Sequence, residues 1–391
     1  MQKPINIAID ASNIRSGGGL THLSRLLQFA IPEEQRVKRV FVWGGRHTLA
    51  ELPEKKWLQK VHVPMLDCLL PIRVLWQQAV LPIRVRQNSC DILFSPGGTV
   101  PVISPVPVVT MSQNMLPFES AEAARYPLGS PFRTKLSILR RVQSFSMRHA
   151  AGIIFLTRYA KESILPAILG FKGKTVTVPH GIENRFFCEP REGLSIEAYS
   201  TTKPFRIKYV STIDDYKHQI EVAVAVAAVR AKGFPVELQL VGSARQSYLR
   251  KLESKLKNLD PSGEFLRYSG NIVFARLHEV YQEANLFIFA SSCENLPNIL
   301  LEAMASGVPI VSSNKGPMPE VLGSAGMYFN PESPSEIADA ITAMIESTAL
   351  RAKSASEAYL LAKVYSWESC SADTLSFIWS VFESSNTGMI N

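Results

Sequence analysis

Short apolar runs alternate with helix-like patterns along the whole chain, and this alternation limits the possible folds more than any other feature. Between the runs, apolar residues recur three and four positions apart, as in the segment that begins at Leu20. In the first half the expected strands span residues 5–9, 37–43, 91–95, 106–111, 152–156 and 175–179. Strands that alternate with helices predict an α/β fold with a mostly parallel sheet.

The same alternation restarts in the second half, after a polar, proline-containing segment at 189–203 that we interpret as a linker. The expected strands there span 206–210, 236–241, 286–290 and 308–312, and the expected helices span 219–232, 247–259, 276–283, 297–306, 335–347 and 355–364. The simplest organisation is two Rossmann-like βαβ domains, residues 1–188 and 204–370. Because open α/β sheets bind ligands at the carboxyl ends of their strands, two facing domains predict a site in the cleft between them.

Charge and cysteine content limit the partners and the compartment. The 391 residues include 42 Lys and Arg but only 34 Asp and Glu, so the net charge of +8 calls for an anionic partner. The five cysteines are scattered without metal-ligand spacing, which favours a reducing, cytoplasmic compartment. The first ten residues do not resemble a signal peptide, and prolines interrupt the uncharged stretch 92–118. We therefore expect no membrane-spanning helix.

The most informative segment, 291–311, carries two glutamates, Glu294 and Glu302, separated by seven residues. Between them the chain is expected to leave a strand, turn through Leu296, Pro297 and Asn298, and enter a helix. The free N–H groups of a helix start can bind an anion such as a diphosphate. A carboxylate can accept hydrogen bonds from two neighbouring sugar hydroxyls. Taken alone, the two glutamates are more simply explained as solvated charges near a helix start.

This segment resembles the E-x7-E signature of the retaining GT-B glycosyltransferases of family 4, the glycosyl transferases group 1. Further similar segments are 178–182, 241–242, 268–270, 280–286 and 365–368, so the resemblance covers essentially the full length. It implies a GT-B architecture of two facing Rossmann-like domains with an interdomain cleft, the first completed by a C-terminal helix at about 371–391. It also implies a nucleotide-diphosphate sugar as donor, bound mostly by the second domain. Glu302 is then expected to hold the ribose hydroxyls, and Glu294 to orient the transferred sugar.

Lys217 lies in the turn that follows the expected strand 206–210. An ammonium group there can offset the charge that develops on a departing diphosphate, although a solvated loop lysine explains the residue equally well by itself. The resemblance assigns catalysis to Lys217 and Glu294, with no protein nucleophile. The family usually has an arginine five positions before this lysine, where the chain has Thr212. Arg245 is a candidate substitute.

The glycine cluster 17–19 lies between the first expected strand and the first helix, where glycine lets the backbone approach a ligand closely. It is not a G-x-G-x-x-G dinucleotide fingerprint, and a flexible surface turn is the alternative reading. The resemblance places Gly18 and Gly19 against the donor phosphates or the acceptor. Where the family often has a histidine that contacts the sugar, this chain offers Gln113 and Asn114. These amides bind hydroxyls but do not relay protons near neutral pH.

Basic and apolar residues are interspersed along the expected helix 132–149 and in the segment 71–86. The basic residues of the helix are Arg133, Lys135, Arg140, Arg141, Arg148 and His149, and its expected apolar face is Leu136, Leu139, Val142 and Phe145. This composition favours binding to an anionic membrane surface, with a solvated helix face as the alternative. The sequence contains no nucleic-acid-binding motif, so nucleic acid is not an expected partner.

The residues and the resemblance together predict a retaining hexosyltransferase. It would move a sugar, with mannose as one candidate, from a nucleotide-diphosphate sugar to a lipid-linked saccharide in envelope polysaccharide or lipopolysaccharide synthesis. The sequence has no Asp-x-Asp motif, P-loop or H-E-x-x-H motif, so we expect neither a metal ion nor a cofactor. The expected location is peripheral, on the cytoplasmic face of the membrane. Two alternatives stay open: a catalytically silent GT-B protein that binds a nucleotide sugar, and a GT-B epimerase or phosphorylase.

Overall fold

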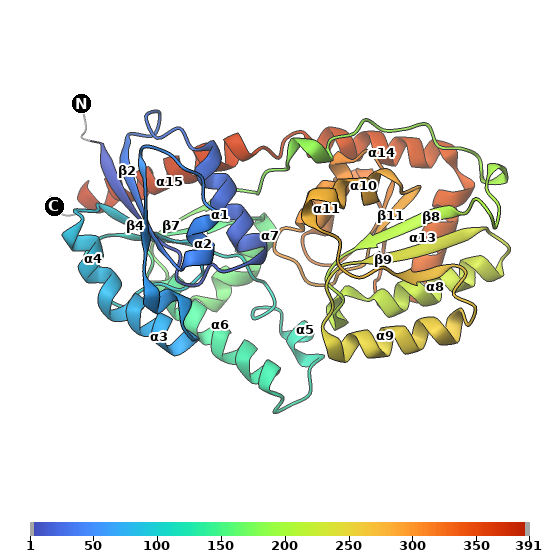
Figure 1. The fold of residues 1–391 in the computed structure, drawn as a ribbon, viewed down its shortest axis with the longest axis horizontal. Coiled ribbons are helices and arrows are strands. Elements are labelled where there is room, and N and C mark those ends of the chain that lie inside the picture. The colour runs from blue at the N-terminus through green and yellow to red at the C-terminus, as the bar shows by residue number, and fades with distance from the viewer. Residues whose placement is uncertain (1–3, 388–391) are drawn as a thin grey trace. The chain divides into compact units, whose positions relative to one another are not determined.

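The computed structural model describes residues 4–387, which fold into two compact units (Figure 1). The first unit holds the chain up to Gly181 and again from Ser366 onward, and the second unit runs from Ile182 to Tyr365. The segment 189–203 therefore belongs to the second unit and is not a linker between the two. The last residues of the expected helix 371–391 lie outside the described part of the chain.

The first unit is built on seven parallel strands in the order β3-β2-β1-β4-β5-β6-β7. They are β1 (Ile5–Asp10), β2 (Val37–Gly44), β3 (Leu58–His62), β4 (Ile92–Ser95), β5 (Val108–Met111), β6 (Gly152–Phe155) and β7 (Lys174–Thr177). The chain winds outward from β1 in one direction to β3, and then from β4 in the other direction to β7. The carboxyl ends of β1 and β4 therefore flank the point where the strand order reverses, which is where open α/β sheets bind ligands.

Helices cover this sheet, and the C-terminal helix is one of them (Figure 1). They are α1 (Gly17–Phe29), α2 (Arg46–Ala50), α3 (Leu70–Leu75), the π-helix η2 (Trp76–Val80), α4 (Leu81–Gln87), α5 (Ser120–Ala124), α6 (Pro131–His149), α7 (Arg158–Ile164) and α15 (Trp367–Thr387). Helix α15 packs against α1 and contacts β4 and β6. The hydroxyl of Ser371 donates to the carbonyl of Leu26 at 2.9 Å, so the C-terminal segment is an integral part of the first unit.

The second unit is built on six parallel strands in the order β10-β9-β8-β11-β12-β13. They are β8 (Phe205–Val210), β9 (Val236–Val241), β10 (Leu266–Tyr268), β11 (Leu286–Phe289), β12 (Ile310–Ser313) and β13 (Met327–Phe329). The helices are α8 (Gln219–Ala231), α9 (Gln246–Leu259), α10 (Leu277–Gln282), α11 (Asn298–Ala305), α12 (Met318–Leu322), α13 (Pro334–Glu346) and α14 (Thr348–Ala362). The α/β class with two mostly parallel sheets is confirmed.

The strands that the sequence missed are at the edges of the sheets, where burial is weaker. β3, β10 and β13 each end a sheet, and each combines buried with exposed or half-buried residues. The central strands β4, β5, β6, β11 and β12 are buried at every position, as parallel strands covered on both faces must be. The sequence therefore identified the centres of the sheets and, among the edge strands, only β7.

Helix α6 buries a different face from the one expected. Leu136 is buried and Leu139 is half-buried, but the side chains of Val142 and Phe145 are 44% and 48% exposed. The positions that pack inward toward the C-terminal end are instead Gln143, Ser146 and Met147. The exposed side of α6 therefore carries apolar as well as basic side chains.

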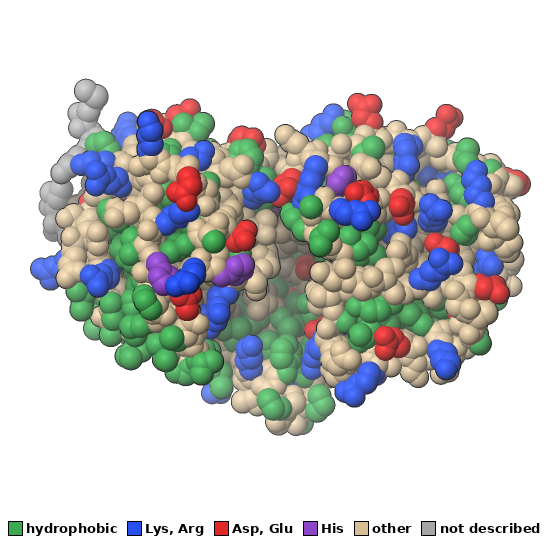
Figure 2. Space-filling model, viewed as in Figure 1, with side chains coloured by type: hydrophobic (Ala, Val, Ile, Leu, Met, Phe, Trp, Pro, Cys, Tyr) green, Lys and Arg blue, Asp and Glu red, His purple; other side chains and the backbone are tan. Residues whose placement is uncertain are grey.

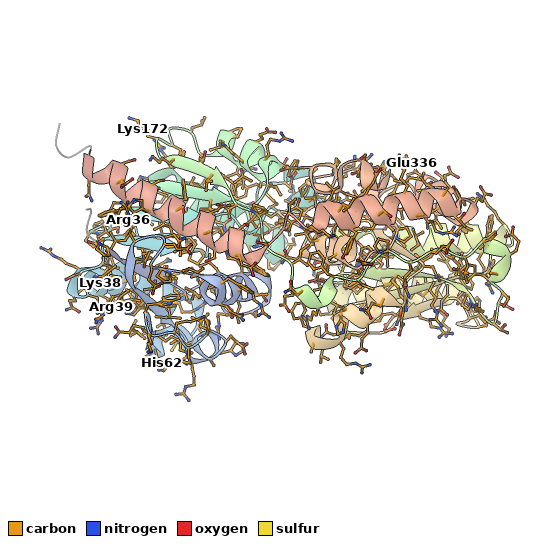
Figure 3. The ribbon with its side chains drawn as sticks, turned by 90° about the horizontal axis from the view of Figure 1, so that it is seen from above. Arg36, Lys38, Arg39, His62, Lys172 and Glu336 are labelled. Carbon is orange, nitrogen blue, oxygen red and sulfur yellow. The ribbon has the colours of Figure 1, made fainter. Side chains whose placement is uncertain are left out.

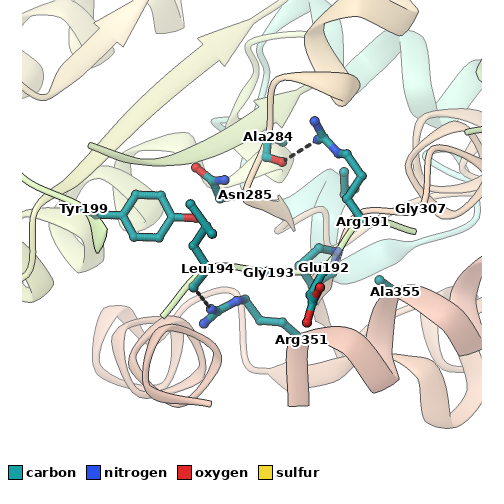
Figure 4. A pocket seen from close by; sticks show the side chains of 12 residues that line it. Arg191, Glu192, Gly193, Leu194, Tyr199, Ala284, Asn285, Gly307, Arg351 and Ala355 are labelled. Carbon is teal, nitrogen blue, oxygen red and sulfur yellow. Dashed lines mark hydrogen bonds between the residues drawn. The ribbon is translucent and has the colours of Figure 1, made fainter. Parts of the chain in front are cut away.

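The segment 189–203 is fixed to the second unit by two arginines that surround a cavity of about 180 Å³ (Figure 4). Arg351 of α14 is buried and donates to the carbonyls of Met344 and Ile345 at the end of α13, and to the carbonyl of Leu194. Arg191 donates to the carbonyl of Ala284. Since backbone acceptors bind both guanidinium groups, we interpret this cavity as a structural junction.

Candidate active site

The candidate site of the second unit forms where β8 and β11 end. After β8 the chain makes a short 3-10 turn, Asp215–Lys217, and enters α8 through His218 in a left-handed conformation (φ 53°). Lys217 is 5% exposed, and its ammonium group donates to the carboxylate of Glu294. The ammonium also lies 4.9 Å from the centre of the Tyr216 ring. The structure thus brings together the two predicted catalytic residues as a partly buried ion pair.

Further hydrogen bonds, separate from the Lys217–Glu294 ion pair, connect the segments that follow β8 and β11. The backbone N–H of Ser292 donates to the carbonyl of Tyr216 at 2.9 Å. The Ser292 hydroxyl lies 3.0 Å from Nε2 of the buried His218. The position of Lys217 relative to Glu294 is therefore fixed by the backbone on both sides.

The turn between the two glutamates differs slightly from the expected one. Helix α11 begins at Asn298 and not at Pro297, which is the residue before the helix with φ −80° and ψ 90°. Among the described residues, no side chain caps this helix start by a hydrogen bond. Oδ1 of Asn298 is buried without a hydrogen-bond partner, and Leu296 is buried. The start of α11 thus offers polar groups that a ligand can satisfy.

Glu302 lies in α11, and its carboxylate is buried against Tyr281 of α10. The Tyr281 hydroxyl donates to Oε2 of Glu302 at 2.8 Å. Burial raises the pKa of Glu302 to about 8, because a buried carboxylate loses its hydration, although the Tyr281 hydrogen bond and the charge of Arg185 oppose this shift. The carboxyl group is therefore poised to change its charge near neutral pH, as groups in binding sites often are.

Arg245, the candidate substitute for the missing arginine at Thr212, binds the turn before Lys217. Its guanidinium lies 3.2 Å from Oδ1 of Asp214 and 3.6 Å from Oδ2 of Asp215. Two carboxylates therefore offset its charge, and it fixes the turn that carries Lys217. In this structure Lys217 is the cation that contacts Glu294.

Gly242, which follows β9, lies against the end of β8. A Cβ atom at this position would be 2.0 Å from the carbonyl oxygen of Ser211, and φ is +145°. Glycine at position 242 therefore allows the carboxyl ends of β8 and β9 to approach each other this closely.

Replacing Gly242 with alanine should lower the free energy of unfolding by about 3 kcal/mol or more, since the clash involves backbone that cannot move aside cheaply. Urea unfolding monitored by circular dichroism measures the change. The matched control is Gly263→Ala, which also has a positive φ (+70°) but nothing within 4 Å of its Cβ position. The control should lose only about 1–2 kcal/mol, and equal losses in both variants would contradict the steric explanation.

In the first unit, the predicted acceptor-side residues lie at the ends of β1 and β5. Gly18 and Gly19 form the first turn of α1 and are not a loop as expected. A Cβ atom on Gly19 would lie 2.7 Å from Oε1 of Gln113, so this turn and Gln113 meet. Asn114 is exposed, and its side-chain oxygen accepts a hydrogen bond from the N–H of Leu116.

A polar network that the sequence did not predict lies at the same edge of the sheet. The buried carboxylate of Asp10 accepts hydrogen bonds from Gln77 (2.5 Å), Ser95 (3.0 Å) and the N–H of Ser12 (3.0 Å). The one available signal was an acidic residue that ends an apolar strand. Because the protein itself supplies these hydrogen bonds, we interpret Asp10 as a structural residue. It connects the carboxyl ends of β1 and β4 to η2.

The two doubly wound sheets and the site at the strand exits define a protein of the GT-B fold class. The fold is similar to that of the crystal structure of Anabaena HepE in complex with UDP, with a TM-score of 0.69, 20% identity, and coverage of 96% of this chain and 100% of that one. At this identity the likeness shows the fold, and the predicted GT-B fold is confirmed. Residues 204–347 match the model of the family described as glycosyl transferases group 1. The matched segment lies within the second unit and contains the E-x7-E motif, so the predicted resemblance to this family is confirmed over these residues.

Curated relatives match over shorter stretches. The O-antigen chain mannosyltransferase B of Escherichia coli is 32% identical over 111 residues, which is 28% of this chain and 29% of the relative. The capsular polysaccharide biosynthesis glycosyltransferase CapM of Staphylococcus aureus is 25% identical over 230 residues, 56% of this chain and 58% of the relative. The matched stretches thus span less than two thirds of either relative.

Proposed function

We propose that the protein is a retaining, metal-independent hexosyltransferase that takes its sugar from a nucleotide-diphosphate sugar. The observation that carries the proposal is the Lys217–Glu294 ion pair at the ends of β8 and β11, which lies with the buried Glu302 of α11 inside the segment that matches the family. HepE, which shares the fold, binds UDP in its crystal structure, which supports a nucleotide donor.

In the proposed reaction the bond from the anomeric carbon to the diphosphate breaks, and the bond to the acceptor oxygen forms on the same face of the sugar. The leaving diphosphate takes the proton of the acceptor hydroxyl, so no protein nucleophile is needed. Lys217 and the backbone N–H groups of Leu296 and Asn298 stabilise the charge on the diphosphate. Glu294 orients the transferred sugar, and Glu302 binds the ribose hydroxyls. The acceptor binds the first unit near Gly18, Gly19 and Asn114.

The proposed acceptor is a lipid-linked saccharide of envelope polysaccharide or lipopolysaccharide synthesis. The Escherichia coli relative acts on the O-antigen chain and the Staphylococcus aureus relative in capsular polysaccharide biosynthesis, which supports an envelope polysaccharide, and the former makes mannose the first sugar to test.

An exposed apolar surface of the first unit supports a peripheral position on the cytoplasmic face of an anionic membrane (Figure 2). This surface includes Leu69, Leu70, Val74 and Leu75 at α3, Ile83 of α4, and Val102 and Ile103. Val102 and Ile103 lie in the loop 100–103. The backbone N–H of Val102 donates to the side-chain oxygen of Gln78 in η2, and the N–H of Val100 donates to the hydroxyl of Ser146 in α6. Within residues 4–387, no helix combines the length and the apolar character that a membrane crossing requires.

A transfer assay tests the proposal. A thermal-shift screen against UDP-, GDP- and ADP-sugars should first identify a donor that raises the melting temperature. Transfer of radiolabelled sugar from this donor to a lipid-linked acceptor should then continue in excess EDTA. Loss of transfer in EDTA would refute metal independence. Donor binding without transfer to any acceptor would favour a silent binding protein, and sugar phosphate or epimerised sugar formed without acceptor would favour a phosphorylase or epimerase.

A further inference from the structure

A basic cavity of about 500 Å³ lies at the amino ends of β6 and β7, at the edge of the sheet opposite to the strand exits that carry the proposed acceptor-side residues. Its walls come from the end of α6, the turn before β7 and the last turns of α15. The polar side chains that line it are Arg148, His149, Lys172, Lys174, Ser384 and Ser385. Of the residues that the structure describes, no Asp or Glu lines this cavity.

Among the described residues, no carboxylate forms a salt bridge with the cations of this basic cavity. Within the described chain, neither Arg148 nor Lys172 forms an ion pair with a carboxylate, and Lys174 donates to the backbone carbonyl of Ser380 at 3.0 Å. Because three positive groups in one hollow repel one another, an anion that enters it is bound favourably.

Two glycines shape the wall of the cavity. At Gly170 (φ +82°) a Cβ atom would lie 3.3 Å from Nη2 of Arg148, so its absence makes room for the guanidinium across the turn. At Gly173 a Cβ atom would lie 2.5 Å from the carbonyl oxygen of Ala151, so glycine lets this turn press against the start of β6. The hollow is therefore a consequence of a close backbone approach and not only of long surface side chains.

Exposed apolar side chains adjoin the cavity. Leu169, directly before Gly170, is 78% exposed. Phe145 lies one turn before Arg148 and His149 on α6, and its ring centre is 4.2 Å from that of His149. A free phosphate ion gains nothing from apolar neighbours, whereas a phospholipid places its phosphate beside acyl chains. We propose that this basic cavity binds the phosphate group of an anionic membrane lipid, with Phe145 and Leu169 entering the lipid surface.

This inference deepens the membrane part of the proposed function. Its test measures lipid binding and no sugar transfer, so its failure would leave the transfer reaction standing. Sedimentation of the full-length protein with phosphatidylcholine vesicles, with and without phosphatidic acid, provides the measurement. The double variant Arg148→Ala/Lys172→Ala should bind the phosphatidic acid vesicles at least about tenfold more weakly than the wild type, since each basic residue at an anionic surface contributes to binding. The charge-conserving variant Arg148→Lys/Lys172→Arg should keep most of the affinity.

The matched control is Lys38→Ala/Arg39→Ala, which removes the same charge from exposed positions of β2 in the same unit, away from Lys172 (Figure 3). It should change vesicle affinity less than about threefold. An equal loss in this control would overturn the proposal in favour of unspecific charge attraction. Titration with inorganic phosphate tests the alternative ligand, a free phosphate ion. A variant that loses phosphate binding but keeps full vesicle binding would show that the cavity takes free phosphate and would also overturn the proposal. Equal melting temperatures of all variants establish that they are folded.

Discussion

Replacing Lys217 with alanine should lower kcat for sugar transfer by about 100-fold to 1,000-fold, the typical loss when one preorganised group that stabilises transition-state charge is removed. The reason is that Lys217 is buried and held at the strand exits by its bond to Glu294, whereas Arg245 is bound by Asp214 and Asp215. The measurement is the rate of transfer at saturating donor. The dissociation constant of the donor should change much less, since the charge on the diphosphate grows as it leaves.

The alanine variant also leaves the carboxylate of Glu294 without its partner, so lost stability must be separated from lost catalysis. Lys208→Ala is the matched control. Lys208 lies on β8, the strand before the turn that carries Lys217, and its side chain is 3% exposed. Its ammonium group bonds Gln239 and Glu283 (3.2 Å) and not the site. This control should melt at a lower temperature but keep its kcat while folded. If Lys217→Ala retained more than half of the wild-type kcat, Lys217 would have no catalytic role.

The sequence predicts the centre of each sheet and the family resemblance well, because both depend on local patterns. The apolar runs identify strands such as β11, and the motif around Glu302 identifies the family. The glycine stop at Gly307 predicts the end of α11, since a residue with φ +64° follows the helix there. These features need no knowledge of distant contacts.

Contacts between distant residues could not be predicted in the same way. Lys217 and Glu294 are 77 positions apart, and only the adjacent exits of β8 and β11 bring them together. Tyr281, which sets the environment of Glu302, is an ordinary apolar-face residue in the sequence. Val142 and Phe145 were expected to be buried because helical spacing does not say which of two apolar faces meets the sheet.

The affinity for the donor should depend on pH through Glu302. Its pKa of about 8 in the folded protein means that the carboxyl group is mostly protonated at pH 6 to 7. The proposed role needs the ionised carboxylate, which accepts hydrogen bonds from both ribose hydroxyls. Donor binding should therefore release a proton, and the affinity should fall up to about tenfold for each pH unit below 8. Calorimetric titration in buffers of different ionisation enthalpy measures both effects, and a constant affinity from pH 6 to 9 would refute the role.

Two variants separate this titration from other causes. Glu302→Gln should remove the pH dependence, and Tyr281→Phe should move it to higher pH, because the lost hydroxyl stabilises the carboxylate.

The pH dependence of the free energy of unfolding gives an independent test. Since the folded pKa is raised from 4.5, the stabilisation by the protonated form is fully present below pH 4.5 and is lost as pH rises through 8. The wild type should therefore lose about 1 kcal/mol per pH unit relative to Glu302→Gln within this window. Parallel stability curves for the two proteins would mean that Glu302 is ionised throughout, and that its burial does not control donor binding.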